Sequence, residues 1–462
     1  MTRRSLTVLM KRMTITIAML LAAAVAAPMA DASTRQLTIM QDDGQVRGQT
    51  ARTLDEFDRL GVDIVKLNLY WDEVAPNRRR KPAGFDGADP ADYSWSNYGE
   101  VINGIIDRGM RPFLSLGGRG PRWATGSRGR RGTYRPNAQE FGRFAEAAGR
   151  RFPEVDIWSI WNEPNLYSWL SPQRRKRVPV SPSIYRRLYL AGHRGLRASG
   201  NDDTILLGEL MPRGGTDPRK VPPLQFLREM ACLNRDYRQY RGRAARLRGC
   251  SRVGRIPTSG FAYHPYTLAG GPGVNEARDD AAIGQLGRVR ATLDKLARRG
   301  KLPRRLKIWI TEFGYQTRPP DPFGTPIGRA PSLMDLSEWI AFRNPRVATY
   351  AQYQLCDNDF WQSGLRRENC RPKRGVYEAF RMPLFVRALG RNRVEVFGAL
   401  RSAVGGRAQV ESKAPGGRYR SRGSASVNRA GYFRRIFRVT NAVRHTFRVT
   451  LDGRSRTKRV TR

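Results

Sequence analysis

The sequence has few of the residues that usually bind metal ions. Among its 462 residues are three histidines and four cysteines, and no pair of cysteines has the C-x-x-C spacing typical of zinc sites. The chain also lacks the glycine-rich turn that binds the pyrophosphate of a dinucleotide. We therefore expect neither a metal nor another cofactor. Zinc binding by the cysteines is the alternative, and their spacing argues against it.

Long hydrophobic runs are absent after the first residues. The chain starts with four basic residues, continues with an apolar run at 15–27 and then has the sequence Ala-Asp-Ala at 30–32. This order predicts a signal peptide at 1–32. A membrane anchor is the alternative, but spanning a bilayer takes about 20 apolar residues. Because no later segment is long and apolar enough, we expect a secreted, extracellular protein without a transmembrane segment.

Acidic residues are scarce relative to basic ones. There are 40 Asp and Glu against 84 Lys and Arg, a formal net charge of +44. Such an excess raises the question of nucleic-acid binding. The basic residues are scattered along the chain and no recognition motif is present, so no nucleic acid is expected. An exported protein with a large positive net charge is attracted to anionic cell-wall polymers, membrane surfaces or acidic polysaccharides. A charged surface without a binding function is the alternative.

The four cysteines all follow the predicted signal peptide. An even number in an oxidising compartment favours disulfides, and four cysteines allow three pairings. We expect the local pairing, Cys232 with Cys250 and Cys356 with Cys370, because each bond then closes a short loop. Closing such a loop stabilises the fold by on the order of 3 kcal/mol in the chain-entropy model.

From residue 36 onward, short apolar runs alternate with amphipathic helical patterns. A repeated β-then-α order predicts a parallel sheet covered by helices, and eight repeats predict a (β/α)₈ TIM barrel, an α/β fold. We place this barrel at residues 33–390, with its last helix at 376–388. A doubly wound open sheet is the alternative. The predicted strands are residues 37–40, 62–69, 111–116, 155–160, 205–208, 260–263, 306–310 and 348–355.

The pattern changes after about residue 390. Short strands separated by glycine-containing turns predict a small β-sandwich at 391–462, similar to the immunoglobulin-like modules of exported bacterial proteins. Its role is either attachment to a wall or glycan, or a structural cap on the barrel. We expect the whole chain to be a monomer. The predicted strands of this part are residues 394–400, 408–412, 432–439 and 445–451.

The fourth predicted strand leads directly into a polar pair. It ends in the sequence Trp-Asn-Glu-Pro at 161–164, and Pro164 cannot continue a strand ladder. The C-terminal ends of barrel strands build the active site. We therefore expect the carboxylate of Glu163 at the barrel mouth. An ordinary loop glutamate is the alternative, and the strand context argues against it.

The seventh predicted strand ends in the same way, with the sequence Ile-Thr-Glu-Phe-Gly at 310–314. Two carboxyl groups at one barrel mouth have the composition that glycoside hydrolysis requires. One of them protonates the leaving oxygen, and the other, ionised, attacks the anomeric carbon. The charge on Glu312 disfavours ionisation of Glu163, which keeps Glu163 an acid.

The Asn-Glu-Pro and Thr-Glu-Phe-Gly motifs at these two strand ends resemble those of clan A of the glycoside hydrolases, families 5 and 39 in particular. The resemblance covers most of residues 37–388. It implies a secreted, retaining glycoside hydrolase that acts on a β-linked polysaccharide or oligosaccharide. In that comparison Glu163 is the acid/base and Glu312 is the nucleophile.

The resemblance also implies residues that bind the substrate. Asn162 is similar to the clan's ligand for the sugar 2-hydroxyl. His264 and Tyr266 follow the sixth strand, where the clan often keeps a His or Tyr near the nucleophile. Trp361 resembles the aromatic residue that floors the subsite of the cleaved sugar, although it lies several residues past the eighth strand. The clan's basic residue on strand two has no obvious counterpart, and Lys66 lies where it is expected.

Trp71 lies at the end of the second predicted strand. Because aromatic faces stack on sugar rings, we expect Trp71 to contact the substrate, with core packing as the alternative. Two other functions are considered for the whole chain. A non-catalytic glycan-binding barrel is disfavoured by the presence of both glutamates, and a polyanion-binding surface protein is supported by charge alone.

Overall fold

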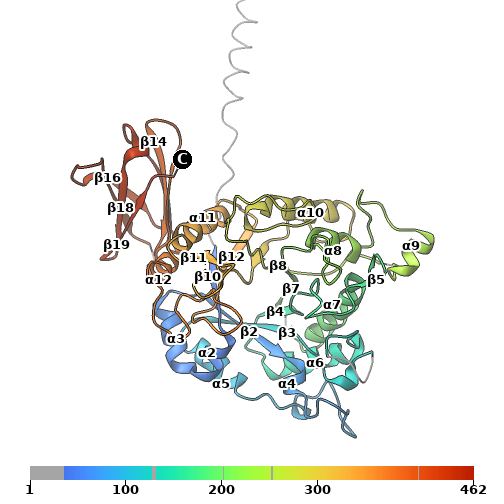
Figure 1. The fold of residues 1–462 in the computed structure, drawn as a ribbon. Helices are drawn as coiled ribbons and strands as arrows, with labels where there is room; N and C mark the ends of the chain where they lie inside the picture. Colours follow the sequence, from blue (N-terminus) through green and yellow to red (C-terminus); the bar gives the residue numbers. More distant parts are fainter. Residues whose placement is uncertain (1–35, 127–131, 201, 251–252, 404, 462) are drawn as a thin grey trace, which may run out of the picture.

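The computed structural model describes residues 36–126, 132–200, 202–250, 253–403 and 405–461. The predicted signal peptide at 1–32 lies outside these residues. The described chain forms a barrel followed by two antiparallel sheets (Figure 1). Within this part of the chain, no helix combines the length and the apolar character needed to cross a bilayer.

Eight parallel strands close into a barrel in which chain order is also ring order, and β12 closes the ring on β1, with Thr349 opposite Leu37. This confirms the predicted TIM barrel and excludes the open sheet. Every predicted barrel strand overlaps one observed strand. The strands are β1 (Leu37–Gln41), β2 (Ile64–Tyr70), β3 (Arg111–Gly117), β4 (Ile157–Ile160), β7 (Thr204–Leu210), β8 (Gly260–Tyr263), β9 (Ile308–Ile310) and β12 (Val347–Tyr353).

Helices cover the outside of this barrel (Figure 1), and most of them bury apolar side chains. In α6, for example, the side chain of Asn137 caps the first turn, while Phe141 and Phe144 are buried. The helices are α2 (Asp43–Gly48), α3 (Thr50–Arg59), α4 (Trp71–Val74), α5 (Tyr98–Ile106), α6 (Ala138–Arg151), α7 (Ser181–Ala198), α8 (Pro223–Met230), α9 (Gly242–Leu247), α10 (Leu286–Arg298), α11 (Ala330–Phe342) and α12 (Val376–Arg381). Two short strand pairs lie in the loops, β5 (Arg174–Arg175) with β6 (Val178–Pro179) and β10 (Thr317–Arg318) with β11 (Thr325–Pro326).

Strand β2 shows how the sequence places polar groups inside the barrel. Its residues are buried from Ile64 to Leu69. Side chains alternate between the two faces of a strand, so Lys66 and Asn68 share one face. The contacts of Lys66 with Glu209 of β7 and with Glu312, two residues after β9, show that this face is the barrel interior. The interior of the barrel therefore carries a cation.

The predicted helix at 376–388 is wrong in its second half. Helix α12 ends at Arg381, and the chain continues as strand β13 (Leu384–Ala388). Pro383 between them cannot extend the helix. Strand β13 pairs with β14 in an antiparallel register, with Val386 opposite Val396. The first antiparallel strand thus begins before residue 390.

The C-terminal strands form a three-stranded and a four-stranded sheet that share one hydrophobic core. Four of the strands were predicted; β13, β16 and β19 were not. The order in the first sheet is β13-β14-β17 and in the second β16-β15-β18-β19. The strands are β14 (Arg393–Ala399), β15 (Arg407–Lys413), β16 (Arg420–Ser426), β17 (Tyr432–Arg438), β18 (Thr446–Leu451) and β19 (Arg454–Arg459).

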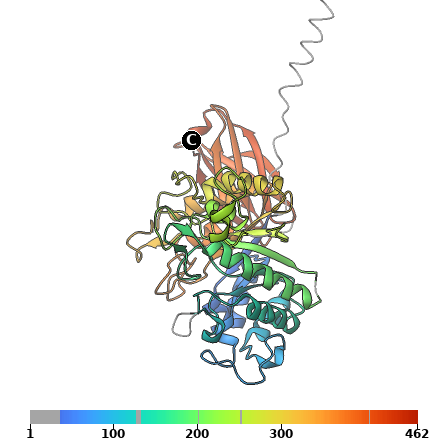
Figure 2. The ribbon, with the colours of Figure 1, turned by 90° about the vertical axis from the view of Figure 1, so that its right-hand side faces the viewer.

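The two sheets stand beside α11, outside the barrel (Figures 1 and 2). Trp339 and Phe342 of α11 pack against Phe385 and Tyr432. A buried ion pair joins the two parts, because a guanidinium nitrogen of Arg401 lies 2.5 Å from Glu338 Oε1. The same sheets therefore contact the barrel through both apolar and charged groups.

Candidate active site

The two predicted catalytic carboxylates meet at one end of the barrel. Glu163 lies three residues after β4 ends, and Glu312 lies two residues after β9 ends. One oxygen of Glu163, one oxygen of Glu312 and one ring nitrogen of His264 all lie within 4.8 Å of one another. The two glutamate side chains keep 14% and 9% of their surface exposed, so a ligand can reach them.

The backbone around Glu163 has an unusual conformation. Trp161 has φ = 68° and Glu163 has φ = 37°, in the left-handed region that non-glycine residues rarely occupy. The Glu163 backbone N–H donates to the carbonyl of Glu209 at 3.0 Å, and the Trp161 ring packs against Gly117, where a Cβ atom would lie only 2.9 Å away. Strained backbone of this kind clusters at functional sites. Here it fixes the direction in which the Glu163 side chain points.

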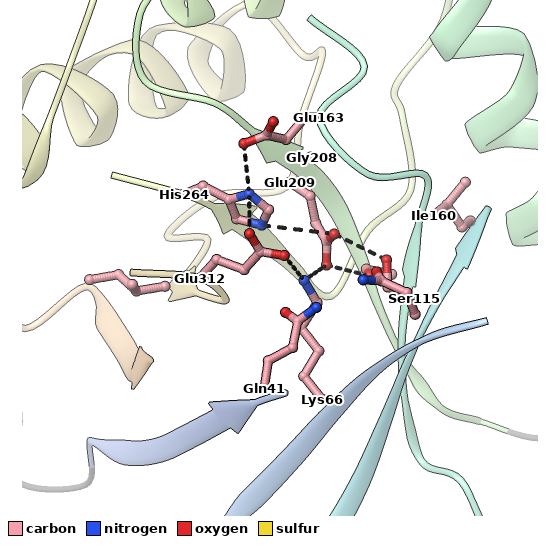
Figure 3. Close-up of polar contacts among 12 residues, drawn as sticks. Gln41, Lys66, Ser115, Ile160, Glu163, Gly208, Glu209, His264 and Glu312 are labelled. Atoms are coloured by element: carbon pink, nitrogen blue, oxygen red, sulfur yellow. Dashed lines mark hydrogen bonds and ion pairs between the residues drawn. The ribbon is translucent and has the colours of Figure 1, made fainter. Parts of the chain in front are cut away.

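His264 lies between the two carboxylates (Figure 3). It follows β8 directly, and its Nδ1 is 3.2 Å from Glu163 Oε1 and 3.4 Å from Glu312 Oε2. The ring is fully buried, and burial lowers the pKa of His264. A neutral imidazole with its proton on Nδ1 can donate to either glutamate without adding a charge between them.

A buried ion-pair network lies beneath Glu312. The Nζ atom of Lys66 is 3.0 Å from Glu312 Oε1 and 3.2 Å from Glu209 Oε1. The hydroxyls of Ser115 and Ser159 donate to Glu209 at 3.0 and 2.7 Å. Figure 3 shows the lysine reaching up between the two glutamates. Lys66 thus occupies the strand-two position at which a basic residue was expected.

Glu209 is the site residue that sequence reasoning missed. It lies in the last part of β7, has φ = 52° and is fully buried. The predicted fifth strand stops at Gly208, one residue short of it. The sequence did contain an indication of this role. Glu209 is an acidic residue at the end of an apolar barrel strand, and Glu312 has a similar position just after its strand. Two apolar residues, Leu210 and Met211, follow Glu209 directly, so the sequence does not mark Glu209 as the start of a loop.

The surroundings of the two mouth carboxylates differ in charge. Burial raises the pKa of Glu163; the contact with His264 opposes this, and the charge of Glu312 adds to it. Burial also raises the pKa of Glu312, but the ammonium of Lys66 lowers it. Burial lowers the pKa of Lys66, but the charges of Glu209 and Glu312 raise it by more, so the pKa of Lys66 is raised overall. The pKa of each glutamate is raised overall, and Glu312 is the one whose ionised form is favoured by direct contact with a cation.

Three other predicted ligands lie at the same end of the barrel. The hydroxyl of Tyr266 donates to Glu312 Oε2 at 3.2 Å, and the half-buried Trp361 packs edge-on against Tyr266 with ring centroids 5.5 Å apart. Asn162 precedes Glu163 and is buried. Asn162 Oδ1 and Trp361 Nε1 have no hydrogen-bond partner among the described residues. Each of these buried polar atoms therefore has a hydrogen-bonding capacity that the described protein atoms leave unused.

Trp71 does not belong to this group, which corrects the prediction. Its side chain is fully buried and packs against Phe141 and Phe144 of α6, with ring centroids 5.6 Å away in both cases. The chain turns into α4 at Trp71, which directs the ring into the core. At the same strand end, Tyr70 lies parallel to Trp169, with an interplanar angle of 7° and centroids 6.5 Å apart.

Both predicted disulfides are present. Cys232 is bonded to Cys250 and Cys356 to Cys370. The second bond closes the loop that carries Trp361. Covalent closure of this loop limits the positions that Trp361 can adopt relative to Tyr266.

Glu163, His264 and Glu312 also form the one cluster of metal-ligand atoms close enough for a metal ion within the described ranges. One oxygen of Glu312 already contacts the ammonium of Lys66. A divalent ion would therefore have to bind beside a fixed positive charge, which costs energy in a buried site. The donor set fits proton and hydroxyl chemistry better than metal coordination.

Comparison of the sequence with protein-family models and with curated proteins finds no match. Solved structures do match. One is a family 39 glycoside hydrolase from the gut symbiont Bacteroides cellulosilyticus WH2, with a TM-score of 0.51, 14% identity, and coverage of 91% of this chain and 81% of that chain. Another is a Cellulomonas fimi endo-β-1,4-mannanase double mutant, with a TM-score of 0.42, 13% identity, and coverage of 93% and 95%. The chain thus shares its fold with a family 39 glycoside hydrolase.

Proposed function

We propose that the protein is a retaining glycoside hydrolase that cleaves the O-glycosidic bonds of a β-linked polysaccharide or oligosaccharide. The separation of the two carboxylates carries this proposal. Oxygens of Glu163 and Glu312 lie within 4.8 Å of each other. Retaining enzymes hold their carboxyl groups about 5–5.5 Å apart, whereas inverting enzymes need about 6.5–9.5 Å to admit a water molecule.

In the first step Glu312 attacks the anomeric carbon and forms a glycosyl-enzyme. Attack requires an ionised carboxylate, and Lys66 favours this form of Glu312. At the same time Glu163 gives its proton to the leaving oxygen. Its raised pKa keeps that proton available.

In the second step Glu163, now ionised, takes a proton from a water molecule that attacks the glycosyl-enzyme. The Nδ1–H of His264, 3.2 Å from Glu163 Oε1, is placed to stabilise this ionised form. Tyr266 donates to Glu312 Oε2 and holds the nucleophile in one orientation. In this proposal Asn162 binds the 2-hydroxyl of the cleaved sugar, and Trp361 lies against the face of the ring.

Secretion is part of the proposal. The signal peptide expected at 1–32 and the two disulfides support an extracellular location. Peptide mapping of the protein recovered from the culture medium tests it. Mature chains should start near residue 33 and should contain no free thiols.

The test of the activity is a screen of the purified protein against β-linked polysaccharides and aryl β-glycosides. Glu163→Gln and Glu312→Gln keep the side-chain shape and remove the carboxylate. Glu100→Gln, at an exposed position of α5, is the matched control. Hydrolysis should be lost in the first two variants and kept in the control. Glycan binding without hydrolysis by the unchanged protein would instead identify a non-catalytic binding protein.

A further inference from the structure

A basic cavity lies on the outer surface of the barrel, away from the carboxylates. Its volume is about 850 Å³, and its walls come from α8, α10 and the loop segments 235–237 and 278–279. Helices α8 and α10 lie side by side on the outside of the barrel (Figure 1). None of the residues that line this cavity contributes to the site formed by Glu163 and Glu312.

The lining of this cavity is far more basic than the chain as a whole. Seven of its thirteen residues are Lys or Arg, whereas 84 of the 462 residues in the sequence are. Five of these cations form no ion pair with any residue that the structure describes, and all five are exposed: Arg235, Arg278, Lys295, Arg298 and Arg299. The composition of the chain alone does not account for this concentration of charge.

The cations are arranged along a helix face. Arg288, Lys295 and Arg299 lie seven and four residues apart, which places them along one side of α10, Arg299 being the residue directly after its last turn. At 1.5 Å per residue this row is about 16 Å long. Arg235 and Arg278 reach the cavity from the facing loops. The positive charge therefore extends along the cavity and is not confined to one point. An anion with several charged groups along its length could contact several of these cations.

The acidic groups of the lining are few and are held apart from one another. Arg228 binds Asp279 through two hydrogen bonds of 2.9 and 2.7 Å, which neutralises that carboxylate. Asp236 is exposed at the rim. A carboxylate accepts hydrogen bonds from hydroxyl groups but repels phosphates. The cavity thus offers cations to anionic groups and acceptors to hydroxyl groups.

We propose that this cavity is a second, non-catalytic site that binds an acidic polysaccharide through its carboxylate or sulfate groups. A polysaccharide of this kind carries anions, which the cations of the lining can bind, and hydroxyl donors, from which the carboxylate of Asp236 can accept hydrogen bonds. The choice of a glycan among polyanions also rests on the proposed function. Binding here would hold a charged polymer on the enzyme while the barrel mouth acts on it.

The experiment measures binding by titration calorimetry with the Glu163→Gln variant of the full chain, which prevents turnover. The probes are two matched pairs, polygalacturonate against its methyl ester and dextran sulfate against dextran. In one triple variant, three cavity cations are neutralised by Arg278→Gln, Arg298→Gln and Arg299→Gln. The control triple, Arg290→Gln, Arg374→Gln and Arg438→Gln, removes the same charge from exposed positions outside the cavity.

At least one anionic polymer should bind while its neutral counterpart does not, and binding should weaken with added salt. The cavity triple should lower the affinity by about tenfold, and the control triple by much less. Equal losses in both triples would show that diffuse charge is responsible and would overturn the proposal. So would the absence of binding to both anionic polymers, or tighter binding of single-stranded DNA at the same cations.

The outcome is separable from that of the proposed activity. Hydrolysis of small aryl glycosides is measured with the same triples in the chain that keeps Glu163. It should be unchanged in the cavity triple, because these arginines lie outside the barrel mouth. Loss of polymer binding with normal hydrolysis supports the second site, whatever sugar the barrel itself cleaves.

Discussion

Lys66 and Glu209 form a fully buried ion pair inside the barrel, with 3.2 Å between Nζ and Oε1. Lys66 has a second carboxylate partner, because the same ammonium lies 3.0 Å from Glu312 Oε1. Glu209 also accepts hydrogen bonds from two serine hydroxyls. The charge on Lys66 is thus divided between a structural carboxylate and the proposed nucleophile. Removal of the charge of Lys66 and removal of the charge of Glu209 should therefore shift the pKa of Glu312 in opposite directions.

Removal of the lysine charge should make Glu312 harder to ionise. Lys66→Met removes the ammonium that lowers the pKa of Glu312, while burial and the charge of Glu209 still raise this pKa. The acidic limb of the pH profile of kcat/KM should move to higher pH, and kcat should fall by on the order of 10²-fold. An unchanged acidic limb would show that Lys66 does not control the nucleophile.

Neutralisation of Glu209 should have the opposite effect on the pH profile. Glu209→Gln keeps the side-chain shape and removes a charge that raises the pKa of Glu312. Lys66 then serves Glu312 alone, so the acidic limb should move to lower pH. A purely structural role for Glu209 would reduce the folded fraction without moving this limb. Activity normalised to folded protein separates the two.

Eight strands and two strand-end glutamates could be predicted because each depends on a local pattern. An apolar run that stops at a polar residue is visible in the sequence alone. The network around Glu209 could not be predicted in this way, because its partners come from three different strands. Only the closed barrel brings Lys66, Ser115 and Ser159 to one carboxylate.

Two other failures have different physical causes. A tryptophan at a strand end has the same sequence context whether it faces the ligand or the core, and the turn into α4 decides this for Trp71. Strands β16 and β19 were missed because they lack an apolar alternation. Their sequences, RSRGSAS and RSRTKR, are dominated by Arg and Ser. Both gain their order from pairing with β15 and β18, which carry the apolar residues.

The two proposed catalytic carboxylates should give different phenotypes when each is replaced by alanine. Glu312→Ala should abolish turnover of every substrate, because no glycosyl-enzyme can form. Glu163→Ala should slow substrates with poor leaving groups by about 10²–10⁴-fold, and should spare the first step for leaving groups that need no proton. A series of aryl glycosides with graded leaving groups measures this. The same dependence on the leaving group in both variants would contradict the assigned roles.

The C-terminal sheets should stabilise the barrel through Arg401. Its side chain and that of Glu338 are 1% and 3% exposed. Arg401→Met leaves Glu338 buried without its cation, which should cost about 3–5 kcal/mol in the free energy of unfolding. The double variant with Glu338→Gln should recover part of this loss. Arg438→Met, at an exposed position, is the control for charge. Denaturant titration measures all of them.

The same contacts bear on whether the sheets can be removed. A chain cut after residue 390 also loses Arg456 and Lys458, whose cationic groups lie 2.8 and 2.7 Å from the buried Asp335. Asp335 and Glu338 would then both lack a cation. We expect the shortened protein to lose cooperative unfolding. A cooperative transition with normal hydrolysis would instead assign the sheets to attachment alone.

The stereochemistry of the product tests the arrangement of the site as a whole. Oxygens of Glu163 and Glu312 lie within 4.8 Å of each other, whereas inverting enzymes hold their carboxyl groups about 6.5–9.5 Å apart to admit a water molecule. In the proposed mechanism Glu312 attacks directly, which inverts the anomeric carbon once. Water activated by Glu163 inverts it a second time, so the first product should have the anomeric configuration of the substrate. Proton NMR of the product, recorded before mutarotation, distinguishes the two anomers. Initial release of the opposite anomer would require a single displacement by water and would exclude Glu312 as the nucleophile.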